Sequence, residues 1–207
     1  TNAGRLWGKK VGFTVIVLDM LKTIAPMWIM WAMLTFIPFG NKPLIADTLT
    51  YYTSANANYI IKWPVYVLTI LGCFIGHCWP CFDKFKGGKG VSAFMGMILG
   101  STWGFGWVPA VIFYFPTLRK TRYVSLCSIL MGIISVVMVW VWVILVSLNV
   151  IPNGYQAIPM FGPTINCTWH FALTMTLVVC LMVIRHHENI ARLLKGEERK
   201  IHWMKEY

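Results

Sequence analysis

A run of glycines and lysines at residues 85–92, with the sequence FKGGKGVS, is the strongest chemical signal in the chain. It directly precedes an apolar stretch that we expect to be helical. Glycines let successive backbone N–H groups point one way, and the helix N-terminus and two lysines add positive potential, so the segment can cradle a phosphate. It is not a Walker A loop, because Asp83 stands five positions before Gly88 and Gly90 follows Lys89 where Ser or Thr is required. Taken alone, the segment could equally be a flexible basic loop.

A second polar cluster has the sequence RHHEN at residues 185–189 and continues to Arg192. It stands at the end of the last apolar stretch. Several hydrogen-bond donors and one carboxylate at a helix end suit the binding of a small polyol phosphate, and histidine can move protons near neutral pH. The plain alternative is an ordinary, positively charged helix flank, which would be preferred if this cluster stood alone.

Other polar side chains fit structural roles. Asp19 and Lys22 stand one helical turn apart inside an apolar stretch, where we expect them to pair. Cys78 and Cys81 have the spacing of a dithiol redox motif, but such motifs work in a βαβ fold, and His77 with two cysteines falls short of a closed zinc site. No Gly-x-Ser-x-Gly nucleophile elbow is present, and carboxylates are too few for a Mg²⁺ centre. We therefore expect no metal and no cofactor.

The composition predicts a membrane protein. Of 207 residues, 57% are hydrophobic and only 12% are charged, about half the charged share of a soluble domain. Lys and Arg number 18 against 7 Asp and Glu, a formal charge of +11. In a membrane protein this excess indicates cytoplasmic loops and anionic headgroups, so a nucleic-acid partner is not expected.

Apolar stretches long enough to cross a bilayer predict the number of spans, since each span needs about 20 apolar residues. Five stretches qualify, at residues 11–37, 59–78, 91–116, 123–150 and 166–184. If the third is split near residues 101–104, every basic cluster falls on one side, as the positive-inside rule requires. We therefore predict an all-α integral membrane protein with six transmembrane helices and a cytoplasmic C-terminus. The tail from Glu188 is predicted to be a basic amphipathic segment interrupted at Gly196.

The pattern leaves two function classes open. A small multi-span transporter or channel would explain the hydropathy equally well. It would not explain why the glycine–lysine run, the segment RYVS at residues 122–125 and the segment HHEN at residues 186–189 all fall on one face. A transporter should concentrate its polar groups near the middle of the membrane. The pattern therefore favours an enzyme whose site is built at the cytoplasmic face.

Several segments together resemble one known family. They are TNAGR at residues 1–5, GKK at 8–10, LDMLK at 18–22, GHxxP at 76–80, FKGGKGV at 85–91, RYVSL at 122–126 and RHHENIxRLL at 185–194. In this order they resemble the bacterial acyl-phosphate:glycerol-3-phosphate acyltransferases, the PlsY family. The resemblance implies transfer of a fatty acyl group from acyl phosphate to the 1-hydroxyl of glycerol 3-phosphate, giving lysophosphatidate and phosphate. It also implies a bacterial cell-membrane enzyme with a cytoplasmic active site and a functional link to an enzyme that forms acyl phosphate.

The resemblance also assigns residues. Glycerol 3-phosphate would be held by Arg5, Lys89, Ser125, His186 and Asn189. The phosphate of the acyl donor would be held by Thr1, Asn2, Gly87, Gly88, Lys89, Gly90 and Val91, with His77 and Glu188 in support. No residue stands out as a general base, and His186 is the one candidate. The family has seven helices and a longer first motif, of which only Thr1-Asn2 matches here, so residues 1–207 are expected to be one N-terminally truncated membrane domain.

Overall fold

The computed structural model describes residues 2–36, 38–39, 42–43, 59–102, 110–148, 150 and 169–201. Its helices are α1 (Asn2–Trp7), α2 (Lys9–Phe36), α3 (Tyr59–Cys78), α4 (Val91–Thr102), α6 (Phe115–Thr121), α7 (Val124–Ser147), α8 (Trp169–Arg185) and α9 (His187–Leu194). A 3-10 turn covers Cys81–Asp83 and a π-helical turn covers Ala110–Tyr114. Two-residue strands, β1 (Pro38–Phe39) and β2 (Lys42–Pro43), pair antiparallel; every other regular element among the described residues is helical.

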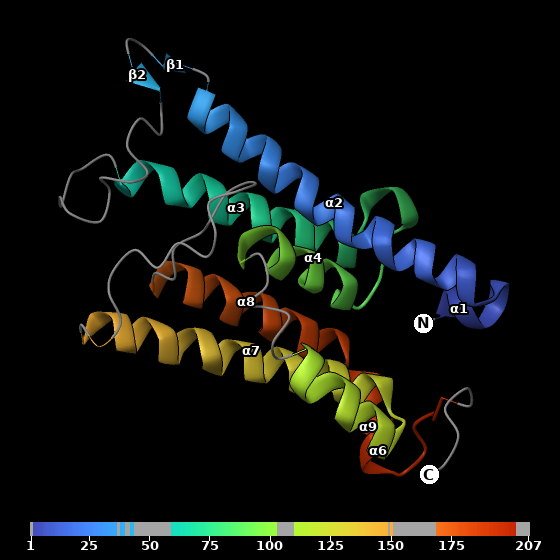
Figure 1. The fold of residues 1–207 in the computed structure, drawn as a ribbon. Coiled ribbons are helices and arrows are strands. Elements are labelled where there is room, and N and C mark those ends of the chain that lie inside the picture. The colour runs from blue at the N-terminus through green and yellow to red at the C-terminus, as the bar shows by residue number, and fades with distance from the viewer. Residues whose placement is uncertain are drawn as a thin grey trace.

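The long helices form a bundle with α4 at its centre (Figure 1). Helix α4 contacts α2, α3 and α8, while α7 packs along α8. The core between them consists mainly of Met, Phe and Val side chains, among them Phe74, Phe94 and Met182. At Gly96, a Cβ atom would lie 2.5 Å from the Met20 carbonyl oxygen. Glycine is needed there because α2 and α4 approach each other backbone to backbone, as small residues allow in membrane bundles.

The helices follow the predicted apolar stretches, but six membrane crossings are not confirmed. Within the described residues, Lys9–Met30 and Val124–Leu145 are long and apolar enough to span a membrane, and the bent pair Phe171–Arg185 and His187–Leu194 adds a third if counted as one span. Helix α4 has 12 residues, which gives about 18 Å of helix against the ~30 Å of a bilayer core. The break is predicted near residues 101–104; α4 ends at Thr102, and residues 103–109 lie outside the described residues.

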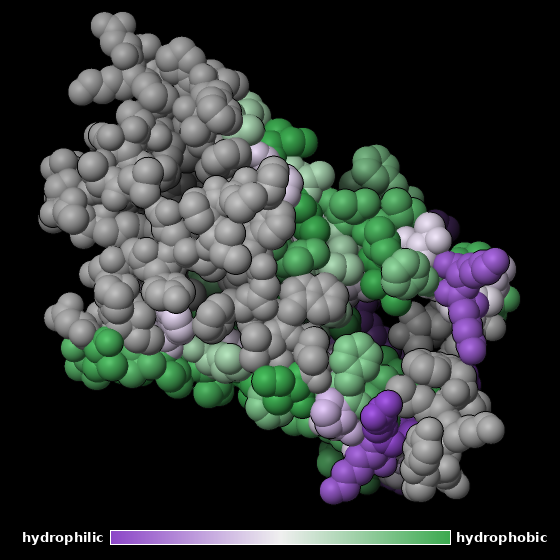
Figure 2. Space-filling view, viewed as in Figure 1, coloured by the Kyte–Doolittle hydropathy of each residue, from purple (hydrophilic) through white to green (hydrophobic). Residues whose placement is uncertain are grey.

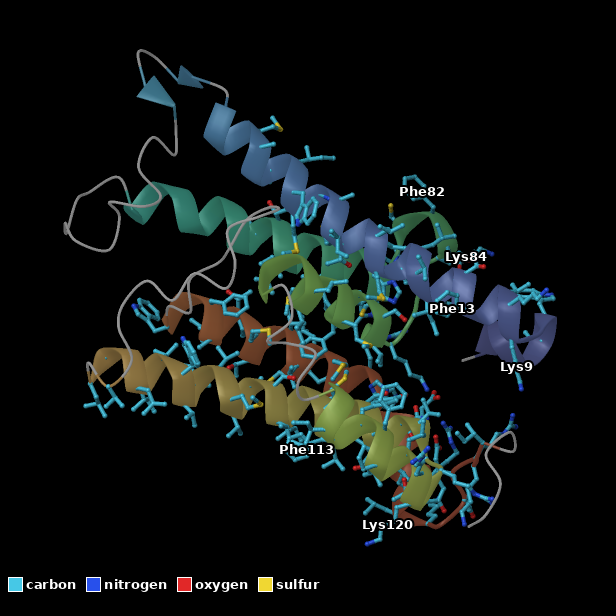
Figure 3. The ribbon with its side chains drawn as sticks, in the orientation of Figure 1. Lys9, Phe13, Phe82, Lys84, Phe113 and Lys120 are labelled. Carbon is cyan, nitrogen blue, oxygen red and sulfur yellow. The ribbon has the colours of Figure 1, made fainter. Side chains whose placement is uncertain are left out.

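The surface of the bundle is apolar along its length. On α7, the side chains of Ile133, Val137, Val141 and Ile144 are about half exposed and recur every three to four residues, so they form one outward stripe. Hydrophilic residues gather at the end near α1 and α6, while green apolar residues run along α7 (Figure 2). Lys9, Lys84 and Lys120, from three of the basic segments, all lie at that same end (Figure 3). The basic segments therefore share one end of the fold, as the charge pattern predicts.

Candidate active site

A cavity of about 410 Å³ opens among the elements at this basic end. It is lined by side chains of α2, by the glycine loop from Gly87 to Val91, by Ser125 of α7, by His186 and Asn189 after α8, and by Glu198 of the tail. These residues range in the sequence from Val15 of α2 to Arg199 of the tail. Only the packing of α2, α4, α7 and α8 brings them together.

The glycine loop has its shape because side chains cannot fit there. The Gly88 N–H donates to the His77 carbonyl oxygen at 3.2 Å, and a Cβ on Gly87 would lie 2.3 Å from that same oxygen. Gly90 has φ +84 and faces the Phe74 ring, where a Cβ would lie 2.3 Å from Cζ. Its carbonyl accepts from the Phe94 N–H at 2.8 Å, which starts α4. The first N–H groups of α4 lack partners within the helix, so this end attracts an anion.

Arg185, the last residue of α8, fixes the loop from the other side. Its guanidinium donates to the Gly87 carbonyl at 2.8 Å and to the Gly88 carbonyl at 3.2 Å, and it lies 5.2 Å from the Trp79 ring centroid. In a planar trans peptide the C=O and the next N–H point in opposite directions. The bond to the Gly88 carbonyl therefore directs the Lys89 N–H away from Arg185.

His77, predicted to support the site, lies directly under the loop. A Cβ on Gly88 would lie 2.3 Å from its Nε2. Its Nδ1 is 3.6 Å from Asp19 Oδ1, too long for a hydrogen bond. Asp19 is paired with Lys22 at 2.7 Å, which confirms the predicted pair. His77 therefore supports the loop through its backbone carbonyl and the packing of its ring.

A polar network joins four elements beside the loop. Lys89 Nζ donates to Asn189 Oδ1, and Asn189 Nδ2 donates to Glu198 Oε1 at 2.7 Å. Ser125 Oγ donates to the same Glu198 oxygen at 2.8 Å, and Arg192 Nε donates to Glu198 Oε2 at 2.8 Å. Three of the predicted glycerol 3-phosphate residues are thus within one connected network.

Burial changes the acid–base behaviour of this network. Burial lowers the pKa of Lys89, and the positive charge of Arg192 lowers it further, although nearby glutamates oppose this. Burial alone would raise the pKa of Glu198, but hydrogen bonds from Asn189, Arg192 and Ser125 outweigh it and hold that pKa below its ordinary value. Glu198 is therefore a carboxylate at neutral pH, and it partly balances the positive charge around Lys89.

His186 lies between α8 and α9 and is 2% exposed. Its Nδ1 is 2.7 Å from the Met182 carbonyl oxygen. Because a carbonyl only accepts, Nδ1 carries a hydrogen and Nε2 of the neutral ring is an acceptor. Burial lowers the pKa of His186, against the opposing effect of the Met182 carbonyl, so the ring is neutral at pH 7. This geometry suits a substrate hydroxyl better than a phosphate.

The remaining predicted residues divide into two groups. Thr1 and the side chains of Asn2 and Arg5 lie outside the described residues, although the backbone of residues 2–7 forms α1 at the same end as the cavity. Glu188 is described, but its side chain is 68% exposed and lies 3.9 Å from Arg192, so it contacts the network only at its edge.

Sequence reasoning missed Glu198 and the role of Arg185. Glu198 lies in a basic tail where a carboxylate looks like a solvated charge, and its partner Ser125 is 73 residues away. The available signal was the isolated acidic pair Glu197-Glu198. No group of three or more His, Cys, Asp or Glu residues that could hold a metal ion occurs in the part of the chain that the structure describes.

Comparison with known proteins identifies the class and then the family. The fold matches two crystal structures of PlsY, an integral membrane glycerol 3-phosphate acyltransferase, one in a lysophosphatidic acid form and one in a glycerol 3-phosphate form. Both have a TM-score of 0.65 and 26% identity; the matches cover 97% and 96% of this chain, and 78% and 75% of those chains. The site and the fold thus define an integral membrane acyltransferase.

Sequence comparison agrees. Residues 1–196 match the family described as glycerol-3-phosphate acyltransferase. Glycerol-3-phosphate acyltransferases of Pasteurella multocida and Staphylococcus aureus are each 29% identical over 99% of this chain, covering 76% and 80% of their own lengths. The chain belongs to the glycerol-3-phosphate acyltransferase family. This confirms the predicted family and enzyme class and decides against the transporter or channel.

Proposed function

We propose that the protein transfers a fatty acyl group from acyl phosphate to the 1-hydroxyl of glycerol 3-phosphate, giving lysophosphatidate and inorganic phosphate. The observation that carries this proposal is the presence of two anion-binding groups in one cavity. One is the glycine loop at the N-terminus of α4, and the other is the network around Lys89, Ser125 and Asn189. The matched PlsY structures in glycerol 3-phosphate and lysophosphatidic acid forms support the same acceptor and product.

We propose residue roles from this arrangement and, for Thr1, Asn2 and Arg5, from the family resemblance alone. The backbone from Gly87 to Val91, with Thr1 and Asn2, holds the phosphate of the donor. Glycerol 3-phosphate is held by Arg5, Lys89, Ser125, His186 and Asn189. His77 packs under the glycine loop, and Glu188 supports Arg192 from the surface.

The chemistry needs positioning more than activation. An acyl phosphate is already a mixed anhydride. The 1-hydroxyl oxygen forms a bond to the acyl carbon, the bond between that carbon and the phosphate oxygen breaks, and the departing phosphate takes the hydroxyl proton. Holding two substrates in line accounts for up to ~7–11 kcal/mol of the barrier in favourable cases. Preorganised N–H groups and cations around the departing phosphate add an electrostatic share.

The proposed setting is a bacterial cell membrane, crossed six times by this single domain, with the basic end in the cytoplasm. Both substrates are anionic and water-facing at their phosphates, which suits a site at the end of the bundle rather than at its middle. The donor must be supplied by an enzyme that makes acyl phosphates, so a functional link to such an enzyme is part of the proposal.

A product assay on purified, detergent-solubilised protein tests this function. The protein, as residues 1–207, receives palmitoyl phosphate and glycerol 3-phosphate, and lysophosphatidate and phosphate are quantified. Palmitoyl-CoA serves as the control donor. We expect equal amounts of both products from palmitoyl phosphate and none from palmitoyl-CoA. If lysophosphatidate forms from palmitoyl-CoA but not from palmitoyl phosphate, the proposed donor is wrong.

A further inference from the structure

Glu198 lies in the basic tail, yet its side chain contacts three residues at the candidate site, Ser125, Asn189 and Arg192. Its side chain is 8% exposed. One carboxylate oxygen accepts from Ser125 Oγ and Asn189 Nδ2, and the other accepts from Arg192 Nε. This buried carboxylate satisfies three donors at once. Removing it would leave those donors facing a cavity without that partner, which is energetically costly.

These contacts determine the orientation of the Asn189 amide. An amide has a donor end and an acceptor end. With Nδ2 held by Glu198, Oδ1 faces Lys89 Nζ and accepts from it. Without the carboxylate, no other acceptor among the described residues fixes the donor end, and an amide turned over would present NH₂ to an ammonium group. The position of the Lys89 charge therefore depends on Glu198 through Asn189.

The backbone of the tail brings Glu198 to this position. Helix α9 ends before Gly196, which has φ +72 and turns the chain back. Beyond Glu198, Ile201 is buried against Leu118 and Cys127. The Ile201 N–H donates to the Arg122 carbonyl at 3.0 Å. The tail is thus fixed on both sides of Glu198, which holds the carboxylate in the network.

We propose that Glu198 is a positioning residue of the acyltransferase site. Its carboxylate holds Ser125 and Asn189 in the orientation that binds glycerol 3-phosphate and, through Asn189, places the Lys89 ammonium. This inference rests on the proposed function, because it assigns the network to the acceptor substrate. It predicts that loss of Glu198 weakens binding of glycerol 3-phosphate and leaves the acyl-donor subsite, formed by the glycine loop, unchanged.

The test compares E198Q, E198A and E198D with the matched control E197Q. Glu197 is the exposed neighbour, so its substitution removes the same charge without touching the network. Calorimetric titration of the purified full chain with glycerol 3-phosphate gives Kd, and initial rates give KM for each substrate. We expect E198Q and E198A to raise Kd and KM for glycerol 3-phosphate by about tenfold, the effect of one lost charge-assisted hydrogen bond. E198D should fall between wild type and E198A, and KM for palmitoyl phosphate should stay within about twofold.

A double-mutant cycle separates positioning from general damage. If Glu198 acts through Lys89, adding E198A to K89A should raise Kd and KM for glycerol 3-phosphate only slightly. The reason is that the effects of coupled residues are non-additive. Full additivity, or an equal rise in KM for both substrates, would overturn the proposal. So would tighter binding by E198Q, which would mean that the carboxylate competes with the substrate phosphate. Thermal unfolding of each variant shows whether the fold is retained, and E198Q provides the near-isosteric measurement if E198A is destabilised.

The two proposals fail in different ways. If the wild-type protein binds glycerol 3-phosphate but makes no lysophosphatidate from palmitoyl phosphate, the proposed donor is wrong and the Kd comparison still decides the role of Glu198. If the wild-type protein does not bind glycerol 3-phosphate, the assignment of the network to that substrate is wrong, and the inference about Glu198 is rejected with it.

Discussion

At the residue scale, the acid–base properties of the cavity depend on which atoms of each side chain already make hydrogen bonds within the protein. His186 has Nδ1 committed to the Met182 carbonyl, so Nε2 is the ring nitrogen left for a ligand. Lys89 and Glu198 have their charged groups linked through Asn189. Because burial disfavours the charged form of His186 and lowers its pKa, the ring is neutral at pH 7. A hydrogen-bond acceptor and a cation thus line the same cavity, which suits a ligand that carries both a hydroxyl and a phosphate.

Replacing His186 tests its role at this scale. We expect His186→Ala to raise KM for glycerol 3-phosphate by about tenfold, the value of one hydrogen bond near 1.4 kcal/mol, with a smaller change in kcat. Burial lowers the pKa of His186, so the wild-type ring becomes protonated only at a pH below the ordinary histidine pKa. Protonation turns Nε2 into a donor, so the difference in KM between wild type and variant should narrow as pH falls and persist from pH 7 upward.

Steady-state kinetics across pH, with His187→Ala as control, check this expectation. His187 is the exposed neighbour, and its Nδ1 is 2.9 Å from the Ile184 carbonyl oxygen. Titration of the substrate phosphate is common to both proteins and cancels in the comparison. An unchanged KM with a collapsed kcat would instead make His186 the general base.

Helix ends and the loop between α3 and α4 build the site at the element scale. The loop leaves α3 at Cys78, makes the 3-10 turn at Cys81–Asp83 and enters α4 at Val91. Its path passes so close to His77 and Phe74 that side chains are excluded at three glycines. Arg185 then ties the loop to the end of α8. The conformation of the glycine loop, the proposed donor subsite, is therefore determined by close backbone packing.

Substitution of Gly90 tests this packing. Gly90→Ala places a Cβ 2.3 Å from Phe74 Cζ at a positive φ. We expect it to destabilise the protein by about 2–4 kcal/mol, from left-handed strain and overpacking, and to raise KM for the acyl donor.

Gly72→Ala is the matched control, since its Cβ would meet no heavy atom within 4 Å. Thermal unfolding and donor kinetics measure both variants in the same detergent, and Gly72→Ala should behave as wild type. Wild-type stability and donor KM in Gly90→Ala would show that the loop is not sterically fixed.

At the scale of the whole molecule, apolar side chains cover the body of the bundle and basic residues lie at one end. The outward stripe on α7 and the exposed apolar side chains of α2, such as Phe13 and Leu18, suit contact with lipid. Basic residues from segments far apart in the sequence lie at the end that contains the cavity (Figure 3). This distribution predicts that the site faces the cytoplasm, where Lys and Arg accumulate in membrane proteins.

Cysteine accessibility tests this orientation. Cys81 is exposed in the loop between α3 and α4. In an active variant that keeps only Cys81, a membrane-impermeant maleimide should label inverted vesicles and leave intact cells unlabelled. A second variant, with Asn153→Cys as its single cysteine in a loop that the charge pattern places outside, should show the opposite result. Labelling of Cys81 in intact cells would show that this loop faces outward and that the proposed topology is wrong.

Sequence by itself determined the helices, the glycine loop and the family. Apolar stretches specify helices locally, as α3 shows by covering residues 59–78, and glycines with lysines mark an anion site without reference to other segments. Only the tertiary structure decided how Asn189 is oriented and that Glu198 belongs to the site. The partners of Glu198 come from α7 and α9, and whether a carboxylate is solvated or buried depends on packing between segments distant in the sequence. No local pattern records that packing, because a buried ion contact is defined by its neighbours in space.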